Sequence, residues 1–288
     1  MLALAATFSW GCAFPLIKLG LAEFQIDPQS TGSKALFAGI RFFLAGFVVL
    51  ILARMLKRSF EIKEKAYYGW IVLFALVNTA LHYFFFYIGL SNTYGSRASI
   101  LDSLSTFLLV FLACLFFKEE HLHTRKVVGC ICGFGGILIL NAGGGSSGSF
   151  TMMGDGMMIL NSFCMAFGGI LTRIICRKMD ALFATGLGLS IGGFMLIVCG
   201  KLMGGVIPVW TGKGCVILFL LVCVSSVGFS IYNQLMQFHP VGNVAIYNSL
   251  IPVFGVILSC LLLGEAFMPQ YIPAGLLVSA GVYIVNRQ

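Results

Sequence analysis

One carboxylate, Asp102, interrupts a long apolar run of the sequence. It stands about five residues into the run that begins at Ala98, or roughly 7 Å along a helix. An acid at the centre of a bilayer costs about 2.5–3.5 kcal/mol on insertion scales, so it must face a cavity or a partner. We interpret Asp102 as a contact for a cation or ammonium group, or as a carboxylate that couples a proton. The alternative is a structural role near the outer interface, in which Asp102 pairs with Arg97 or caps its helix.

His82 is a second titratable side chain in an apolar run, near the middle of residues 67–90. If the two runs form neighbouring antiparallel helices, a His82–Asp102 pair would titrate near physiological pH and would be able to carry a proton. The alternative is a histidine that is hydrogen-bonded within the core and takes no part in function.

Neutral polar side chains recur at the same apparent depth. In hydrocarbon such groups either hydrogen-bond a neighbouring helix or line a wet cavity, and periodicity does not separate the two cases. We include the whole set in the predicted substrate-binding site: Asn78, Ser103, Asn161, Tyr232, Asn233, Tyr247, Asn248 and Ser249.

Aromatic residues complete the predicted site. Trp10, Phe14 and Tyr83 are placed to form a wall for a flat or cationic solute. The chain contains 27 phenylalanines, so aromatic side chains that only face lipid are the alternative explanation.

Several chemistries are not expected. The ten cysteines are spread through apolar runs with no paired CxxC or histidine partner, so we predict neither a metal site nor disulfides. The glycine-rich stretch 143–149 lacks the Lys-Ser/Thr ending of a phosphate-binding loop, and we predict no cofactor. An intramembrane aspartyl protease would need a second acid at the depth of Asp102, and Asp155 lies at the edge of the linker. No serine stands one helical turn from His82, so a Ser–His dyad is not expected either. We therefore predict that the protein is not an enzyme.

The composition predicts a membrane protein. Of 288 residues 59% are hydrophobic and only 10% are charged, with a mean hydropathy of +0.99. Soluble domains carry about 25% charged residues. The apolar runs are unbroken, as in helical spans and unlike the short alternating strands of a barrel. The net charge of +8 comes from residues between the runs, which is typical of topogenic charge and not of nucleic-acid binding.

Ten helices are predicted, at residues 2–20, 35–56, 67–90, 98–119, 125–141, 154–176, 181–203, 213–236, 244–265 and 270–286. The Gly/Ser-rich composition around residues 143–149 is typical of a flexible linker. We therefore divide the chain into a first unit at 1–142, a linker at 143–153 and a second unit at 154–288.

The two units are related by a repeat. Residues 98–119 and 244–265 share eight identities at a constant offset of 146 residues, ending with Glu119 and Glu265. Because five helices is an odd number, the second copy must enter the membrane from the opposite side, which makes an inverted repeat. The predicted fold is all-α, with ten transmembrane helices in two inverted five-helix repeats. We expect Glu119 and Glu265 to share a structural role, such as holding a neighbouring helix end.

The basic residues predict the orientation. With the N-terminus inside, twelve lysines and arginines fall at inside-facing ends and six at outside-facing ends, which favours both termini in the cytoplasm. Small residues four apart on the fifth and tenth helices (Gly129 and Gly133, Gly275 and Ser279) are compatible with packing inside a monomer or between two copies in a homodimer.

A family resemblance follows from these motifs. WGCAFPLIK at 10–18, Arg41-Phe42, Lys118-Glu119 and Gly264-Glu265, together with the repeat, resemble the EamA domain family of the drug/metabolite transporter superfamily. The resemblance implies a secondary transporter in the bacterial plasma membrane, with a small-molecule substrate, often an exported amino acid, and no nucleic-acid partner. It also implies a central cavity between the two repeats. Proton coupling is compatible with Asp102 and His82.

Two other functions fit the same residues. Efflux of cationic drugs or quaternary amines would suit Asp102 and the aromatic side chains. A scaffold or receptor with a vestigial cavity would carry no flux, and its polar residues would be packed without water.

Overall fold

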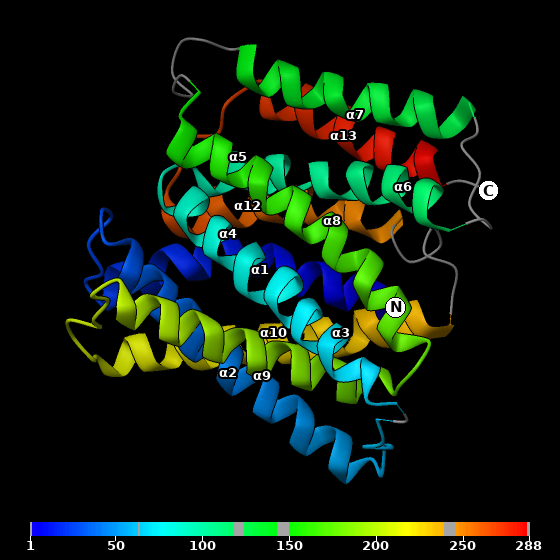
Figure 1. The fold of residues 1–288 in the computed structure, drawn as a ribbon. Helices are drawn as coiled ribbons and strands as arrows, with labels where there is room; N and C mark the ends of the chain where they lie inside the picture. The colour runs from blue at the N-terminus through cyan, green and yellow to red at the C-terminus, as the bar shows by residue number, and fades with distance from the viewer. Residues whose placement is uncertain (1, 63, 118–123, 143–149, 239–245, 287–288) are drawn as a thin grey trace.

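The computed structural model describes residues 2–62, 64–117, 124–142, 150–238 and 246–286, and this part of the chain is entirely helical, without a strand. The prediction of an all-α fold is confirmed for these residues. Figure 1 shows the elements in order: α1 (Leu2–Glu23), α2 (Thr31–Met55), α3 (Ala66–Ala75), η1 (Leu76–Leu81), α4 (His82–Ser91), α5 (Gly95–Asp102), α6 (Leu104–Phe116), α7 (Thr124–Ala142), η2 (Met152–Gly156), α8 (Met157–Cys176), α9 (Ala181–Leu202), α10 (Gly212–Phe238), η3 (Ile246–Leu250), α12 (Ile251–Leu263) and α13 (Tyr271–Asn286).

Seven helical segments in the described part of the chain are long and apolar enough to cross a membrane. Shorter apolar helices add to them at Val127–Gly136, Ile251–Leu263 and Tyr271–Ile284. The seven segments are Leu2–Glu23, Thr31–Met55, Tyr67–Ser91, Gly95–Phe116, Met152–Cys176, Ala181–Leu202 and Gly212–Phe238.

Side-chain caps set several helix starts. The Ser30 hydroxyl accepts from the Ser33 N–H at the start of α2. Asp180 Oδ1 accepts from the N–H groups of Leu182 and Phe183 at the start of α9 (2.9 and 3.2 Å). Each cap satisfies a first-turn N–H that has no partner within the helix.

Two of the spans are irregular at their centres. The third span changes from α-helix to π-helix over Leu76–Leu81 and back again. The predicted helix 98–119 begins earlier, at Gly95, and is interrupted at Ser103. There the Thr106 N–H bonds the Ser103 carbonyl three residues back (3.1 Å), while the Asp102 carbonyl accepts from the Ser105 hydroxyl (2.6 Å). Such interruptions occur often at functional sites and line cavities in membrane proteins.

Two helix pairs run antiparallel in close contact, α2 with α9 and α7 with α13, at opposite edges of the molecule in Figure 1. Glycines allow the approach. A Cβ on Gly39 of α2 would lie 2.6 Å from the Ile197 nitrogen of α9, and one on Gly136 of α7 would lie 2.7 Å from the Ala274 oxygen of α13. Further along α2, Gly32 lies against Gly205, and Gly46 lies against Ser190 and Gly186, so α9 runs in the opposite direction.

The central helices lie between these two pairs. α1 packs mainly on α10 and α12, whereas α8 packs mainly on α6, α4 and η1. With the sequence offset of 146 residues, α8 corresponds to α1, the span α3–η1–α4 corresponds to α10, and α5–α6 corresponds to η3–α12. The main contacts of α8 therefore reproduce those of α1.

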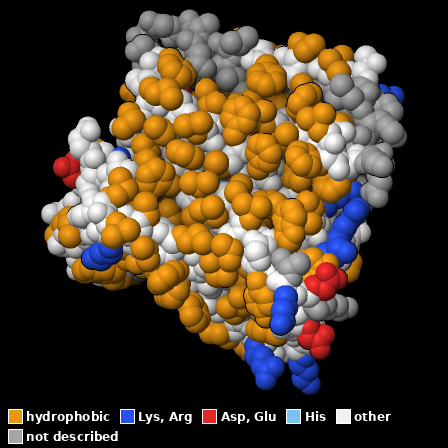
Figure 2. Space-filling model, in the orientation of Figure 1, with side chains coloured by type: hydrophobic (Ala, Val, Ile, Leu, Met, Phe, Trp, Pro, Cys, Tyr) orange, Lys and Arg blue, Asp and Glu red, His pale blue; other side chains and the backbone are white. Residues whose placement is uncertain are grey.

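The surface carries a broad apolar belt. Figure 2 shows hydrophobic side chains over most of one face, with lysines and arginines toward its edges. Exposed large side chains include Phe47 (47%), Ile51 (58%) and Phe219 (65%). In water such a surface would be unfavourable, whereas against lipid tails it is expected.

Candidate functional site

A cavity lies at the centre of the helices, bordered by elements from both halves of the chain. Its volume is about 80 Å³, several times the roughly 10–15 Å³ that one water needs. The lining residues are Trp10, Ala13, Phe14, Ile17, Arg41, Asn78, His82, Tyr83, Phe86, Asp102, Ser105, Thr106, Leu109, Met165, Gly169, Thr172, Phe229, Tyr232, Asn233, Met236, Asn248 and Ile251.

Most of the predicted site residues border this cavity: Trp10, Phe14, Asn78, His82, Tyr83, Asp102, Tyr232, Asn233 and Asn248. Four others are placed differently. Ser103 is buried and donates to the Ser99 carbonyl (3.4 Å). Asn161 does not line the cavity but donates a hydrogen bond to Asp102, which does. Tyr247 is 37% exposed, and the side chain of Ser249 lies outside the described residues.

Asp102 is held by a neutral partner. Its side chain is only 8% exposed, and Oδ1 accepts from Asn161 Nδ2 at 2.7 Å. The proposed alternative, an ion pair with Arg97, does not occur, because Arg97 pairs with Asp155. The repeat equivalent of Asp102, Asn248, also borders the cavity, and its Nδ2 donates to Tyr232 Oη at 3.1 Å.

His82 lines the cavity without a bond to Asp102 among the described contacts, so the predicted His–Asp pair is not formed. Its ring lies parallel to Phe86 (6.2 Å between centroids, 9° between planes) and edge-on to Tyr83 (4.2 Å). Its Nδ1 is buried and finds no hydrogen-bond partner in the described part of the chain.

Aromatic rings form much of the wall. Trp10 packs on Tyr232 (4.8 Å) and Phe229 (5.4 Å), and Phe14 packs on Phe86 (5.4 Å). The Trp10 Nε1–H is buried and has no partner among the described residues. The wall is therefore apolar over most of its area and presents a few separate polar atoms.

Arg41 also lines the cavity, although it is absent from the predicted site and is one of the six basic residues that we counted at outside-facing helix ends. Because α2 begins at Thr31, Arg41 stands ten residues inside it, roughly 15 Å from the start at 1.5 Å per residue. The cap at Ser30 is the signal that would have revealed this depth. The lining residues Phe86, Thr106 and Thr172 carry no comparable signal, since their types are common in apolar helices.

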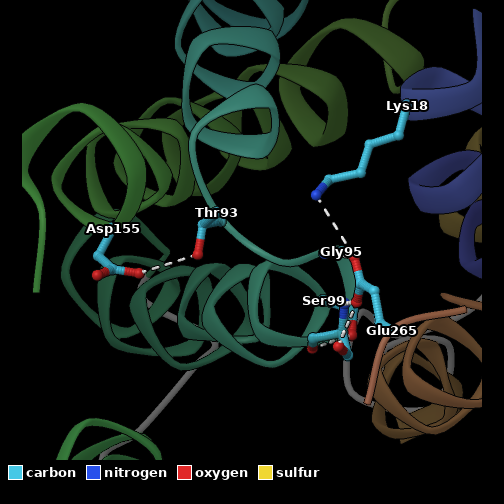
Figure 3. Close-up of polar contacts among 7 residues, drawn as sticks. Lys18, Thr93, Gly95, Ser99, Asp155 and Glu265 are labelled. Carbon is cyan, nitrogen blue, oxygen red and sulfur yellow. Dashed lines mark hydrogen bonds and ion pairs between the residues drawn. The ribbon is translucent and has the colours of Figure 1, made fainter. Parts of the chain in front are cut away.

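Glu265 links the segment after α12 to the start of α5 (Figure 3). Its carboxylate follows α12 and accepts from the Gly95 N–H (2.7 Å), the Ser96 N–H (3.1 Å) and the Ser96 hydroxyl (2.6 Å), all in the first turn of α5. Lys18 Nζ lies 3.4 Å from Oε1. Burial favours the neutral acid, but the hydrogen bonds from Ser96 and Gly95 and the charge of Lys18 outweigh it and lower the Glu265 pKa. The expected structural role for Glu265 is confirmed, whereas Glu119 lies outside the described residues.

A buried ion pair also involves α5. Arg97 donates through Nε to Asp155 Oδ1 (2.8 Å) and through Nη2 to Oδ2 (2.9 Å), and both side chains are 2% exposed. Thr93 and the Thr151 N–H also donate to this carboxylate (Figure 3 shows the Thr93 contact). Asp155 follows the predicted linker directly, as expected, and its carboxylate is buried there by these bonds.

Comparison with known proteins shows which family the sequence matches. A model described as the EamA-like transporter family matches residues 1–142 and 152–287. The uncharacterized transporter YvbV of Bacillus subtilis is 26% identical over 97% of this chain and 88% of its own. A solved crystal structure of a protein superposes with a TM-score of 0.73 at 15% identity, covering 98% of this chain and 95% of that chain, which shows a shared fold.

Two further relatives are named for what they carry. The S-adenosylmethionine/S-adenosylhomocysteine transporter of Chlamydia muridarum is 23% identical over 97% of this chain and 87% of its own. The probable amino-acid metabolite efflux pump of Salmonella typhimurium is 22% identical over 98% and 93%. The apolar spans, the cavity between them and a family match over nearly the whole length lead to one conclusion: the chain is a multi-pass membrane protein that belongs to the EamA-like transporter family.

Proposed function

We propose that the protein is a secondary transporter that exports a small metabolite, an amino acid or a related compound, across the bacterial plasma membrane by alternating access. The observation that carries this proposal is the cavity, which is bordered by helices of both halves and presents charged and polar groups within an aromatic wall. The Salmonella relative, named as a probable amino-acid metabolite efflux pump, supports the substrate class and the direction.

The chain would be built from two inverted five-helix repeats at 1–142 and 154–288. The antiparallel packing of α2 on α9 and of α7 on α13 supports this, because each pair consists of repeat equivalents at the offset of 146 residues. Equivalent helices that run in opposite directions are expected of a repeat inverted about an axis in the membrane plane. Ten spans would place both termini on the same side, and the excess of lysines and arginines at inside-facing ends favours the cytoplasm. Labelling single cysteines at positions 27 and 58 from either side of the membrane tests this orientation.

Alternating access requires that the end around α5 opens at some stage. The contacts of Glu265 with α5 and Lys18, and of Asp155 with Arg97, join elements of the two halves. Opening this end would separate at least one of these contacts. Asp102 is the proposed proton-coupling group, because no other carboxylate of the described residues lines the cavity.

Efflux of cationic drugs or quaternary amines is the second candidate. Asp102 next to the aromatic wall favours it, because aromatic faces attract cations. Arg41 in the same cavity opposes it, since a second positive charge would be repelled there.

Counterflow in proteoliposomes tests the proposal. Vesicles loaded with unlabelled amino acids, amines or sugars are assayed for uptake of the labelled solute, with and without a pH gradient. We expect exchange of an amino acid, and its loss in Asp102→Asn. Asp27→Asn, the same change in an exposed loop, is the matched control and should retain exchange. Absence of exchange for every solute would refute the transport proposal, and exchange of quaternary amines alone would favour the second candidate.

A further inference from the structure

The cavity holds two opposite charges that the fold keeps apart. Arg41 is 2% exposed and Asp102 is 8% exposed, and both line the same cavity. Neither forms an ion pair with a described residue, although buried charges are normally paired with each other. A second buried arginine in the described part of the chain, Arg97, follows that rule by pairing with Asp155.

Neutral groups position the Arg41 guanidinium without neutralising it. Nε donates to the Leu221 carbonyl (3.2 Å) and to Ser225 Oγ (2.9 Å), and Nη1 donates to Tyr87 Oη (3.1 Å). The guanidinium also lies over the Phe42 ring, 4.7 Å from its centroid. Its Nη2 donors have no partner among the described residues. A guanidinium held in this way keeps a free edge of the kind that binds carboxylates.

Asp102 is held in a corresponding way. Asn161 Nδ2 donates a hydrogen bond to Asp102 Oδ1, while Asp102 Oδ2 has no hydrogen-bond donor in the described part of the chain. The amide orients the carboxylate and leaves its charge uncompensated. Tyr83 lines the same cavity, and its ring packs on Phe42 with 3.8 Å between the centroids.

We propose that Arg41 is a substrate-contacting residue that binds the carboxylate of a zwitterion, while Asp102 binds the ammonium group of the same molecule. This inference rests on the proposed transport function and narrows its substrate class. A zwitterion compensates both buried charges at once. A cation would leave Arg41 uncompensated, and an anion would leave Asp102 uncompensated.

The rest of the wall indicates the nature of the substrate side chain. Phe14, Phe86, Phe229, Leu109 and Met165 contribute apolar surface. The structure therefore assigns the site to an amino acid whose side chain is apolar. Arg41 is the specificity-determining residue, because it excludes amines that lack a carboxylate.

The first test uses the unaltered protein. Counterflow is measured with L-leucine, L-leucinamide and 4-methylpentanoate, and with L-phenylalanine, L-phenylalaninamide and 3-phenylpropionate. Each series keeps the side chain and removes one charge. We expect the amino acid to exchange at least about tenfold faster than either analogue, because a site built to bind a polar group rejects molecules that lack it. Equal exchange of the amide and the amino acid would overturn the inference.

The second test alters the charge. We expect Arg41→Gln to lower exchange of the amino acid at least about tenfold while leaving exchange of the amide unchanged or raised, and Arg41→Lys to be intermediate. Arg58→Gln, the same change at a more exposed ion pair, is the control. A purely structural role for Arg41 would lower exchange of both solutes equally and would overturn the inference. If Arg41→Gln does not fold, the exchange rates of Arg41→Lys and the analogue series of the first test decide whether Arg41 binds the substrate carboxylate.

The two proposals fail in different ways. Exchange of other solutes, with none in either amino-acid series, would overturn the zwitterion inference and leave transport standing. Absence of exchange for every solute in the counterflow screen would remove both.

Discussion

At the scale of single residues, function depends on which hydrogen-bond partners the fold gives to buried polar side chains. Asp102 and Asn161 lie on different helices, and the amide supplies the one hydrogen bond that the carboxylate receives from a described residue. Asn161 does not line the cavity, so it acts through Asp102 as a positioning residue. The same division separates Arg41, which lines the cavity, from Ser225 and Tyr87, which hold it.

We expect Asn161→Leu to destabilise the protein by about 1–3 kcal/mol, because the buried Asp102 carboxylate would lose its donor. The measurement is thermal unfolding in detergent. Thr7→Val is the control: Thr7 is equally buried, but among the described contacts its hydroxyl bonds only the Leu4 carbonyl of its own helix, at 3.0 Å. A control that loses as much stability as Asn161→Leu would contradict this role.

At the scale of elements, helix ends and helix contacts do most of the positioning. The first turn of α5 receives a carboxylate from the segment after α12, where its free N–H groups and the positive end of the helix dipole favour an anion. α5 ends at Asp102, so this contact also helps to fix the depth of the cavity carboxylate.

Glu265→Gln should lower stability at neutral pH by about 1–3 kcal/mol, since an amide oxygen replaces a charged acceptor. The Glu265 pKa is lower in the folded protein than in the unfolded chain, so its contribution is complete above the ordinary value of about 4.3. The contribution is lost as the pH falls through the lowered folded value. The difference in melting temperature between wild type and variant should therefore shrink from pH 6 to pH 3. Glu61→Gln, in an exposed loop, is the control, and a difference that does not depend on pH would refute the assignment.

The close packing of α2 on α9 predicts how a larger residue at Gly39 affects stability. We expect Gly39→Ala to cost about 1–3 kcal/mol, because its Cβ would lie 2.6 Å from the backbone nitrogen of Ile197 and the helices would have to separate. Gly135→Ala on α7 meets nothing within 4 Å and should be neutral or stabilising by up to about 1 kcal/mol, the helix propensity difference. Unfolding in detergent distinguishes the two, and equal effects would count against close backbone packing at Gly39.

At the scale of the whole molecule, the two halves meet around the cavity and at the contacts of Glu265 and Asp155 with α5. The Arg97–Asp155 pair joins α5 in the first half to the turn before α8 in the second. Breaking a buried ion pair costs more than removing both partners, because the remaining charge loses its compensation.

Asp155→Asn alone should therefore cost about 3–5 kcal/mol, and the double change Arg97→Met with Asp155→Asn should cost less than the sum of the two single changes. A double-mutant cycle of unfolding in detergent measures the coupling. Arg58→Gln removes a half-exposed pair at 3.9 Å and should cost no more than about 1 kcal/mol. Additive effects of the Arg97 and Asp155 changes would show that the pair is not coupled.

The amino-acid sequence by itself determined the class of the protein. Insertion into a bilayer depends on the composition of each run, which is a local property, so the apolar helices follow from the sequence. The same logic identified Asp102 and its repeat equivalent Asn248 as polar residues in apolar runs, and both line the cavity.

Only the tertiary structure decided how these groups are partnered. Arg97 bonds Asp155 and not Asp102, Asn161 bonds Asp102, and Arg41 reaches the cavity. The first two contacts join residues 58 and 59 positions apart, on helices whose adjacency no local pattern encodes. A charged residue in an apolar run can be predicted to need a partner, but which partner it contacts depends on how the helices pack.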